Sequence, residues 1–154
     1  MALRLEHRIP PPIVGACVAA LMLGIAWLIP ALTFAVPWRM PVVVILFCIG
    51  AALDVIALVH FLRARTTITP LDPGKASALV ATGIYRFTRN PMYLGMATLL
   101  LAWAVYLANV PALLGLAPFV AYINRFQIVP EELALEARFG DEFRSYRKRV
   151  RRWL

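Results

Sequence analysis

Cysteine is scarce in this sequence, and the motifs of several soluble enzyme classes are missing. Cys17 and Cys48 are the only cysteines among 154 residues. Both lie inside apolar runs, where we interpret them as small hydrophobic side chains. A disulfide framework or a metal site needs more cysteines at tighter spacings, so we expect no bound metal. The polar middle of the chain has no Gly-x-Gly-x-x-Gly, Walker A or His-Glu-x-x-His motif, so soluble nucleotide-binding folds and zinc proteases have no support.

Long apolar segments dominate instead. Hydrophobic residues make up 62% of the chain, well above the roughly 45–50% of soluble domains. Apolar segments cover 13–36, 41–62, 91–108 and 110–129, and a segment of about 20 apolar residues can cross a bilayer. We therefore predict an all-α, polytopic membrane protein with about four transmembrane helices. The tight turn that begins at Asn109 predicts that the last two helices form a hairpin.

This prediction divides a single integral-membrane domain, 1–154, into four parts. Two N-terminal helices occupy 13–62, a cytoplasmic loop occupies 63–90, the helical hairpin occupies 91–129, and a C-terminal cytoplasmic helix occupies 130–154. No internal repeat is visible in the sequence.

Acidic side chains are few, and the distribution of basic ones predicts the orientation. The chain has 8 Asp and Glu against 16 Lys and Arg, for a formal net charge of +8. Arg39 is the only lysine or arginine between the first two apolar segments. The positive-inside rule then predicts that both termini and the central loop are cytoplasmic. In a bacterium the membrane would be the inner (plasma) membrane. The charge indicates attraction to anionic membrane lipids and not nucleic-acid binding.

The C-terminal segment has an amphipathic pattern. Its large apolar side chains recur at steps of three and four residues, which places them on one face of a helix; they are Leu135, Phe139, Phe143, Tyr146, Val150 and Trp153. Such a helix would lie along the lipid headgroups or dock onto the central loop. The simpler alternative is a membrane-surface anchor alone.

The most distinctive polar stretch is Arg89–Gly95, which is followed about forty residues later by Glu131 and Glu132. Pro91 suits the first turn of a helix, and the free amides after it favour an anionic group such as a carboxylate. Gly95 allows a backbone or a ligand to approach closely. The two acids would bind an amino group, a ribose diol or a cation. These features together match a ligand that carries a carboxylate, an amine, a ribose and a positive sulfur.

The stretch from Gly83 to Gly95, together with Pro130-Glu131-Glu132, resembles the integral-membrane methyltransferases typified by isoprenylcysteine carboxyl methyltransferase. Phospholipid N-methyltransferases share the general pattern. The resemblance covers roughly residues 66–154. It implies an S-adenosylmethionine pocket lined by Tyr85, Arg89, Asn90, Pro91, Tyr93, Leu94, Gly95, Glu131 and Glu132. Candidates for a catalytic role are Glu131, Glu132 and Arg125.

The sequence departs from the family pattern at two positions of this site. Asn90 stands where the family often has histidine, so a titrating imidazole is unavailable there. Gln127 stands where an arginine often precedes the acid pair, which bears on how a substrate carboxylate would be recognised.

The resemblance implies methyl transfer to a lipophilic acceptor, a small molecule or a lipid, that is held in the membrane. We expect a carboxylate acceptor and O-methylation. The alternatives are N-methylation of a lipid amine or a non-catalytic membrane or transport protein. A carboxylate needs no general base, whereas an amine must lose a proton, for which Glu131 or Glu132 is the candidate.

Two further polar residues lie in or near the second apolar segment. An acid inside such a segment is energetically costly and often functional. Asp54 would bond a neighbouring helix, be protonated, or line the portal of the substrate. His60 lies near the cytoplasmic end, where we expect an interfacial side chain and not a ligand.

Overall fold

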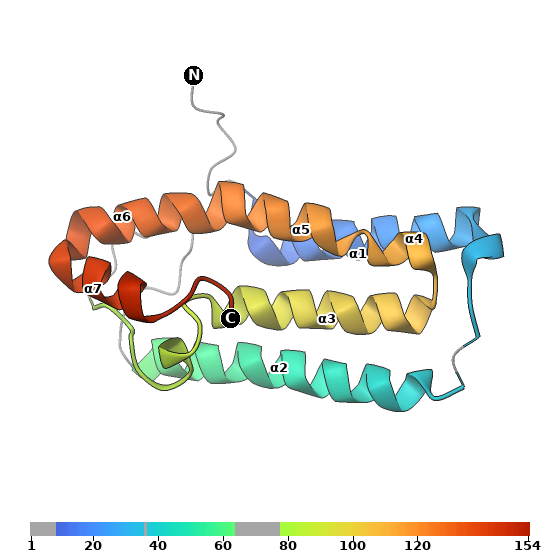
Figure 1. The fold of residues 1–154 in the computed structure, drawn as a ribbon, viewed down its shortest axis with the longest axis horizontal. Coiled ribbons are helices and arrows are strands. Elements are labelled where there is room, and N and C mark those ends of the chain that lie inside the picture. The colour runs from blue at the N-terminus through green and yellow to red at the C-terminus, as the bar shows by residue number, and fades with distance from the viewer. Residues whose placement is uncertain (1–8, 36, 64–77) are drawn as a thin grey trace, which may run out of the picture.

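The computed structural model describes residues 9–35, 37–63 and 78–154. Regular structure in these ranges is helical, and the only extended pairing found there is an isolated bridge between Thr33 and Asn109. The long helices lie roughly along one axis, with α3 between α2 on one side and α1 and α5 on the other (Figure 1). The all-α prediction is therefore confirmed.

Prolines lie at the start of the first N-terminal helix and in the turn that follows it. Helix α1 (Pro11–Leu28) begins with proline, whose missing amide costs nothing in a first turn. A short 3₁₀ turn, η1 (Pro30–Leu32), follows it, and α2 (Arg39–Arg63) comes next.

The second half of the chain begins with the 3₁₀ turn η3 (Gly83–Arg86) and helix α3 (Pro91–Leu107). Ala108 then takes a left-handed conformation with φ of 49°, and the side chain of Asn109 caps the following helix by accepting a hydrogen bond from the Ala112 amide. The amide group of Asn109 also donates to the Ile29 carbonyl at 2.9 Å. The hairpin turn is thus tied to the end of α1.

The chain returns through α4 (Val110–Leu113), α5 (Leu116–Ile123), the π-helical turn η4 (Asn124–Ile128) and α6 (Val129–Phe139). Helix α5 packs against α3 and α1, so the second half forms the expected hairpin. Three helical stretches in the described part are long and apolar enough to cross a membrane: Pro11–Leu28, Arg39–Arg63 and Val110–Phe139. Helix α3 is apolar but has only 17 residues, and a total of four crossings stays a prediction.

The continuous helix predicted over 130–154 is interrupted. Gly140, with φ of 52°, separates α6 from α7 (Asp141–Arg149), and Val150 then leaves the helix with extended backbone. Glycine adopts this positive φ without the steric cost that a side chain would add. The three-and-four spacing predicts one helical face, but the backbone turns at Gly140.

The apolar face of this tail is covered by the chain itself. The buried residues Phe143, Tyr146 and Val150 form a small core with Leu79 and Ala81 of the segment before η3, and with Leu135 and Phe139 of α6. The tail therefore docks onto the end of the central loop, which was one of the two expected arrangements. Trp153 lies apart from this cluster, against the larger core that α1, α3 and α5 form, and donates from Nε1 to Asn124 Oδ1 at 3.1 Å.

Helices α2 and α3 meet at two glycines. A β-carbon on Gly95 would lie 2.9 Å from the Gly50 carbonyl oxygen and would also collide with the carboxylate of Asp54. The close approach that the sequence predicted at Gly95 is thus made by helix α2.

Substituting alanine for Gly95 is expected to destabilise the protein by about 1–3 kcal/mol, because overpacking a tight contact forces the backbones apart. Gly24→Ala is the matched control, since a β-carbon there meets nothing within 4 Å. Thermal unfolding in detergent would compare the two variants. Equal midpoints would contradict the packing argument.

Candidate functional site

The segment that precedes α3 is anchored on the end of α2. Gly83 has φ of 59°, and its α-carbon lies so close to the His60 ring that a side chain there would overlap the imidazole. The buried ring of Tyr85 packs edge-on against the ring of Phe61, with centroids 5.4 Å apart. His60 is therefore a packing residue of this turn.

Tyr85 and the tail residue Tyr146 are joined through the backbone. The Tyr146 hydroxyl donates to the Tyr85 carbonyl at 2.7 Å, and burial raises the pKa of Tyr146 to about 12. Burial, reinforced by the nearby charge of Glu131, also raises the pKa of Tyr85. Both phenols therefore stay protonated at neutral pH. The Tyr85 hydroxyl is buried and has no hydrogen-bond partner in the described part of the protein.

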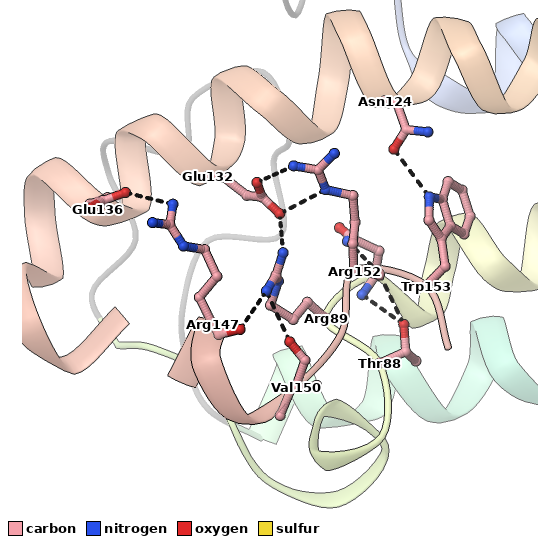
Figure 2. Close-up of polar contacts among 10 residues, drawn as sticks. Thr88, Arg89, Asn124, Glu132, Glu136, Arg147, Val150, Arg152 and Trp153 are labelled. Atoms are coloured by element: carbon pink, nitrogen blue, oxygen red, sulfur yellow. Dashed lines mark hydrogen bonds and ion pairs between the residues drawn. The ribbon is translucent and has the colours of Figure 1, made fainter. Parts of the chain in front are cut away.

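Arg89 lies at the centre of the polar contacts between loop and tail (Figure 2). One guanidinium nitrogen, Nη1, donates to the carbonyls of Arg147 and Val150 at 3.0 and 2.9 Å, and the other, Nη2, lies 2.6 Å from Glu132 Oε1. Its backbone amide donates to the Arg151 carbonyl at 3.0 Å. A single side chain thus links the start of α3, helix α6 and the end of α7.

A second arginine, Arg152, binds the same carboxylate. Its Nη2 and Nε atoms lie 2.6 and 3.1 Å from Oε2 and Oε1 of Glu132, a two-point contact of the strong kind. This pairing raises the pKa of Arg152. The side chains of Glu132 and Arg89 are only 12% and 10% exposed. We call Arg89, Glu132 and Arg152 the C-terminal clasp.

Asn90 holds the backbone of Arg152, one of the clasp residues. Its Nδ2 donates to the Arg152 carbonyl at 2.8 Å, and the hydroxyl of Thr88 donates to the same oxygen at 3.3 Å. In the described residues no side chain caps α3. That Asn90 also lines the cofactor pocket stays a prediction.

Glu131 has different partners from its neighbour Glu132. The hydroxyl of the buried Tyr93 donates to Glu131 Oε2 at 3.3 Å. This acid–phenol pair lies near Tyr85, on which the charge of Glu131 acts. The two adjacent acids therefore have separate surroundings, because successive residues of a helix point about 100° apart.

The remaining residues predicted for the site make packing contacts or hydrogen bonds with neighbouring segments. Pro91 is buried as the first residue of α3, Leu94 is half-buried one turn on, and Gly95 packs against α2. The guanidinium of Arg125 lies 5.4 Å from the centre of the Phe126 ring in the π-helical turn, and its catalytic role stays a prediction. Gln127 is fully buried and donates to the Ile9 carbonyl at 2.8 Å, so it connects the hairpin to the chain before α1.

Sequence reasoning did not single out Arg152 or Thr88 as residues of this site. Arg152 ends a run rich in arginine and lysine, in which no local pattern distinguishes one basic residue from another. One signal in the sequence could have indicated a basic partner for Glu132. A buried acid on a packed helix needs a basic residue to pair with it. Which arginine meets it depends on where the chain leaves α7.

Comparison with known proteins identifies the family of this chain. Residues 38–142 match the family model for phospholipid methyltransferases. A 103-residue stretch, 67% of this chain, is 30% identical to protein-S-isoprenylcysteine O-methyltransferase of Schizosaccharomyces pombe, of which it spans 44%.

A shorter stretch of 63 residues, 41% of this chain, is 52% identical to the whole of an uncharacterized Haemophilus influenzae protein. No solved structure matches significantly. The family match covers α2, α3, α5 and α6, with the residues of the acid–phenol pair and Glu132. This chain belongs to the phospholipid methyltransferase family of membrane proteins.

Proposed function

We propose that this protein transfers a methyl group from S-adenosylmethionine to a lipophilic acceptor at the cytoplasmic face of a membrane. The observation that carries the proposal is the separation of the two acids. Glu132 is held by two arginines, whereas Glu131 has the Tyr93 hydroxyl as its hydrogen-bond donor. Glu131 is therefore the acid of the pair whose remaining oxygen is suited to a ligand.

The donor set fits the proposed cofactor. A carboxylate beside aromatic rings favours a cation, because the face of an aromatic ring carries negative charge. Glu131, Tyr93 and Tyr85 supply such a set, and the buried Tyr85 hydroxyl, without a partner in the described residues, supplies a further polar group for a ribose or an amine. Cofactor binding would involve Tyr85, Tyr93 and Glu131 directly, with Arg89, Asn90 and Glu132 holding the surrounding backbone.

S-adenosylmethionine supplies an electrophilic methyl group when it is bound. The residues of this chain would orient the acceptor and exclude water, which suffices for a carboxylate acceptor. For an amine acceptor the nitrogen lone pair forms the new bond to the methyl carbon as the carbon–sulfur bond breaks, and the amine proton leaves to a base. Glu131 is the better base of the two acids, because the ion pairs of Glu132 stabilise its charged form.

The acceptor chemistry has two candidates. A carboxylate is the first expectation from the sequence, and the printed name of the Schizosaccharomyces pombe relative supports it. An amine is the alternative expected from the sequence, and it is supported by the acid Asp54, which lines a groove beside α3.

Calorimetric titration with S-adenosylhomocysteine tests the cofactor site. Purified wild-type protein in detergent is expected to bind it, and Glu131→Ala and Tyr93→Ala are each expected to weaken binding at least about tenfold, since each removes about 1.4 kcal/mol or more of interaction. Glu136→Ala is the matched control on the same helix, because this acid pairs with Arg144 and Arg147 on the exposed side. A well-folded wild-type protein that does not bind, or three variants that bind equally well, would overturn the proposal.

A further inference from the structure

The π-helical turn η4 (Asn124–Ile128) joins α5 to α6 within one helical stretch, Val110–Phe139. At its end the Val129 amide donates to the Asn124 carbonyl, five residues earlier, whereas an α-helix pairs residues four apart. Such a turn holds one residue more than an α-helical turn. Every side chain after it is therefore rotated by about 100°, the angle of one residue, relative to an unbroken α-helix.

The burial of the apolar side chains records this rotation. Ile123 and Ile128 are both 0% exposed and belong to the same core, although residues five apart in an α-helix point about 140° apart. In an unbroken α-helix Glu131 would point about 80° away from Ile123. With the wider turn it lies within about 20° of that core direction, where it accepts the hydrogen bond from the Tyr93 hydroxyl.

Pro130 gives the sequence a local reason for the turn. It lies inside the helical stretch, in the first turn of α6. In a regular α-helix its ring would clash with the carbonyl four residues earlier, that of Phe126, and it has no N–H to donate. Widening the turn that contains Phe126 moves this carbonyl away from the ring. Pro130 therefore favours the extra residue.

Two amide side chains of the turn attach it to segments near both ends of the chain. Gln127 is fully buried, and its Nε2 atom donates to the Ile9 carbonyl before α1 at 2.8 Å. Asn124 Oδ1 accepts from Trp153 Nε1 after α7 at 3.1 Å (Figure 2). Because Gln127 lies near the end of the turn, closing the turn to α-helical geometry would rotate its side chain away from Ile9. This hydrogen bond therefore stabilises the wider turn.

We propose that the π turn sets the register of α6, which directs Glu131 to Tyr93 and Glu132 to the arginines of the C-terminal clasp. Pro130 and Gln127 are the positioning residues that maintain this register. The role of Glu131 in cofactor binding rests on the proposed function, whereas the placement of the two acids does not.

An unbroken helix would exchange the surroundings of the two acids. Each position of α6 would take the direction of the residue that now follows it. Glu131 would then point at the clasp arginines, and Glu132 would take the direction of Leu133, which is 64% exposed. The acid that holds the tail thus reports the register of α6.

Limited trypsin digestion of the full chain in detergent measures this register without any cofactor. The double variant Gln127→Leu/Pro130→Ala removes the hydrogen bond to Ile9 and supplies an amide at position 130. With the natural turn, Glu132→Ala is expected to accelerate cleavage of the tail at least about tenfold, because removing one partner of a buried ion pair is strongly destabilising, and Glu131→Ala is expected to change it less than about twofold. In the double variant the two acids are expected to exchange these effects.

A deletion of one residue separates register from general destabilisation. Removing Phe126 from the double variant takes out the extra residue, so an unbroken α-helix would again direct Glu131 and Glu132 as in the natural protein. Wild-type resistance to trypsin and its dependence on Glu132 are expected to return, which a purely destabilising deletion would not produce. Pro118→Ala is the control for the loss of a proline outside the turn, because Pro118 is exposed on α5, and it is expected to keep the dependence on Glu132.

Dependence on Glu132 that persists in the double variant, or dependence on both acids or on neither, would overturn the inference, as would a deletion variant that stays sensitive to trypsin. If the double variant does not fold, the deletion variant decides the question alone. If the acids exchange their effects while S-adenosylhomocysteine fails to bind the wild-type protein, the methyl-transfer proposal fails and the register assignment stands. If the cofactor analogue binds and the acids do not exchange, the register assignment fails alone.

Discussion

Replacing Glu132 by alanine is expected to lower the free energy of unfolding by about 3–5 kcal/mol, the cost typical of removing one partner from a buried ion pair. The variant would leave Arg89, whose side chain is 10% exposed, without its carboxylate, and Arg152 would lose both contacts. Because the two arginines hold the tail against the start of α3, the segment after α7 is expected to detach. The substitution is expected to lower stability directly. It is expected to weaken cofactor binding only indirectly, because the segment before α3 is displaced.

Limited trypsin digestion and thermal unfolding in detergent would measure this release. The tail contains trypsin sites at Arg147, Lys148, Arg149, Arg151 and Arg152, and cleavage there is expected to accelerate strongly in Glu132→Ala. Glu136→Ala is the matched control, since its partners Arg147 and Arg144 are 44% and 47% exposed and such pairs contribute about 0–1 kcal/mol. Equal digestion rates in the two variants would show that the clasp does not hold the tail.

Replacing Glu131 by glutamine is expected to slow methyl transfer to an amine acceptor by about 100-fold or more, the usual contribution of a positioned general base. Glutamine keeps the shape of the side chain and still accepts a hydrogen bond from the Tyr93 hydroxyl. It has no basic oxygen that can take the proton of the amine. The clasp is made by the neighbouring acid, so the tail is expected to remain resistant to trypsin.

Single-turnover methyl transfer, measured at saturating cofactor with an amine and with a carboxylate of equal tail length, would test this role. The carboxylate needs no base, so the same variant is expected to change its methylation only through binding. Glu136→Gln is the control for a loss of charge on α6. Wild-type rates for the amine in Glu131→Gln would contradict a base at this position, and equal losses for both acceptors would assign Glu131 to cofactor binding alone.

The local pattern of the sequence predicted much of the helical framework. The apolar runs, the proline at the start of α3 and the turn at Asn109 are local signals, and each coincides with a helix or a helix boundary. The tail shows where such signals fail. The three-and-four spacing from Leu135 to Val150 is real, but Gly140 turns the backbone, so the same apolar residues form a cluster on two short helices.

The same distinction between local signals and tertiary contacts applies to the site residues. Arg89, Asn90, Glu131 and Glu132 were recognised as a group, because they resemble a family motif. Their partners were not predictable, since Arg152 lies twenty residues after Glu132 and sixty-two after Asn90. No local pattern distinguishes Arg152 from the other basic residues of the tail.

The sequence by itself determined that this chain is helical, rich in membrane-length apolar segments and a member of a methyltransferase family, because composition, periodicity and a family motif are properties of the chain read in order. Only the tertiary structure decided that Glu132 belongs to a clasp while Glu131 pairs with Tyr93, and that Asp54 lies in a groove at Gly95. Those outcomes depend on which faces meet when helices pack. Adjacent residues point in different directions, and distant ones come within hydrogen-bond reach only after the backbone has turned.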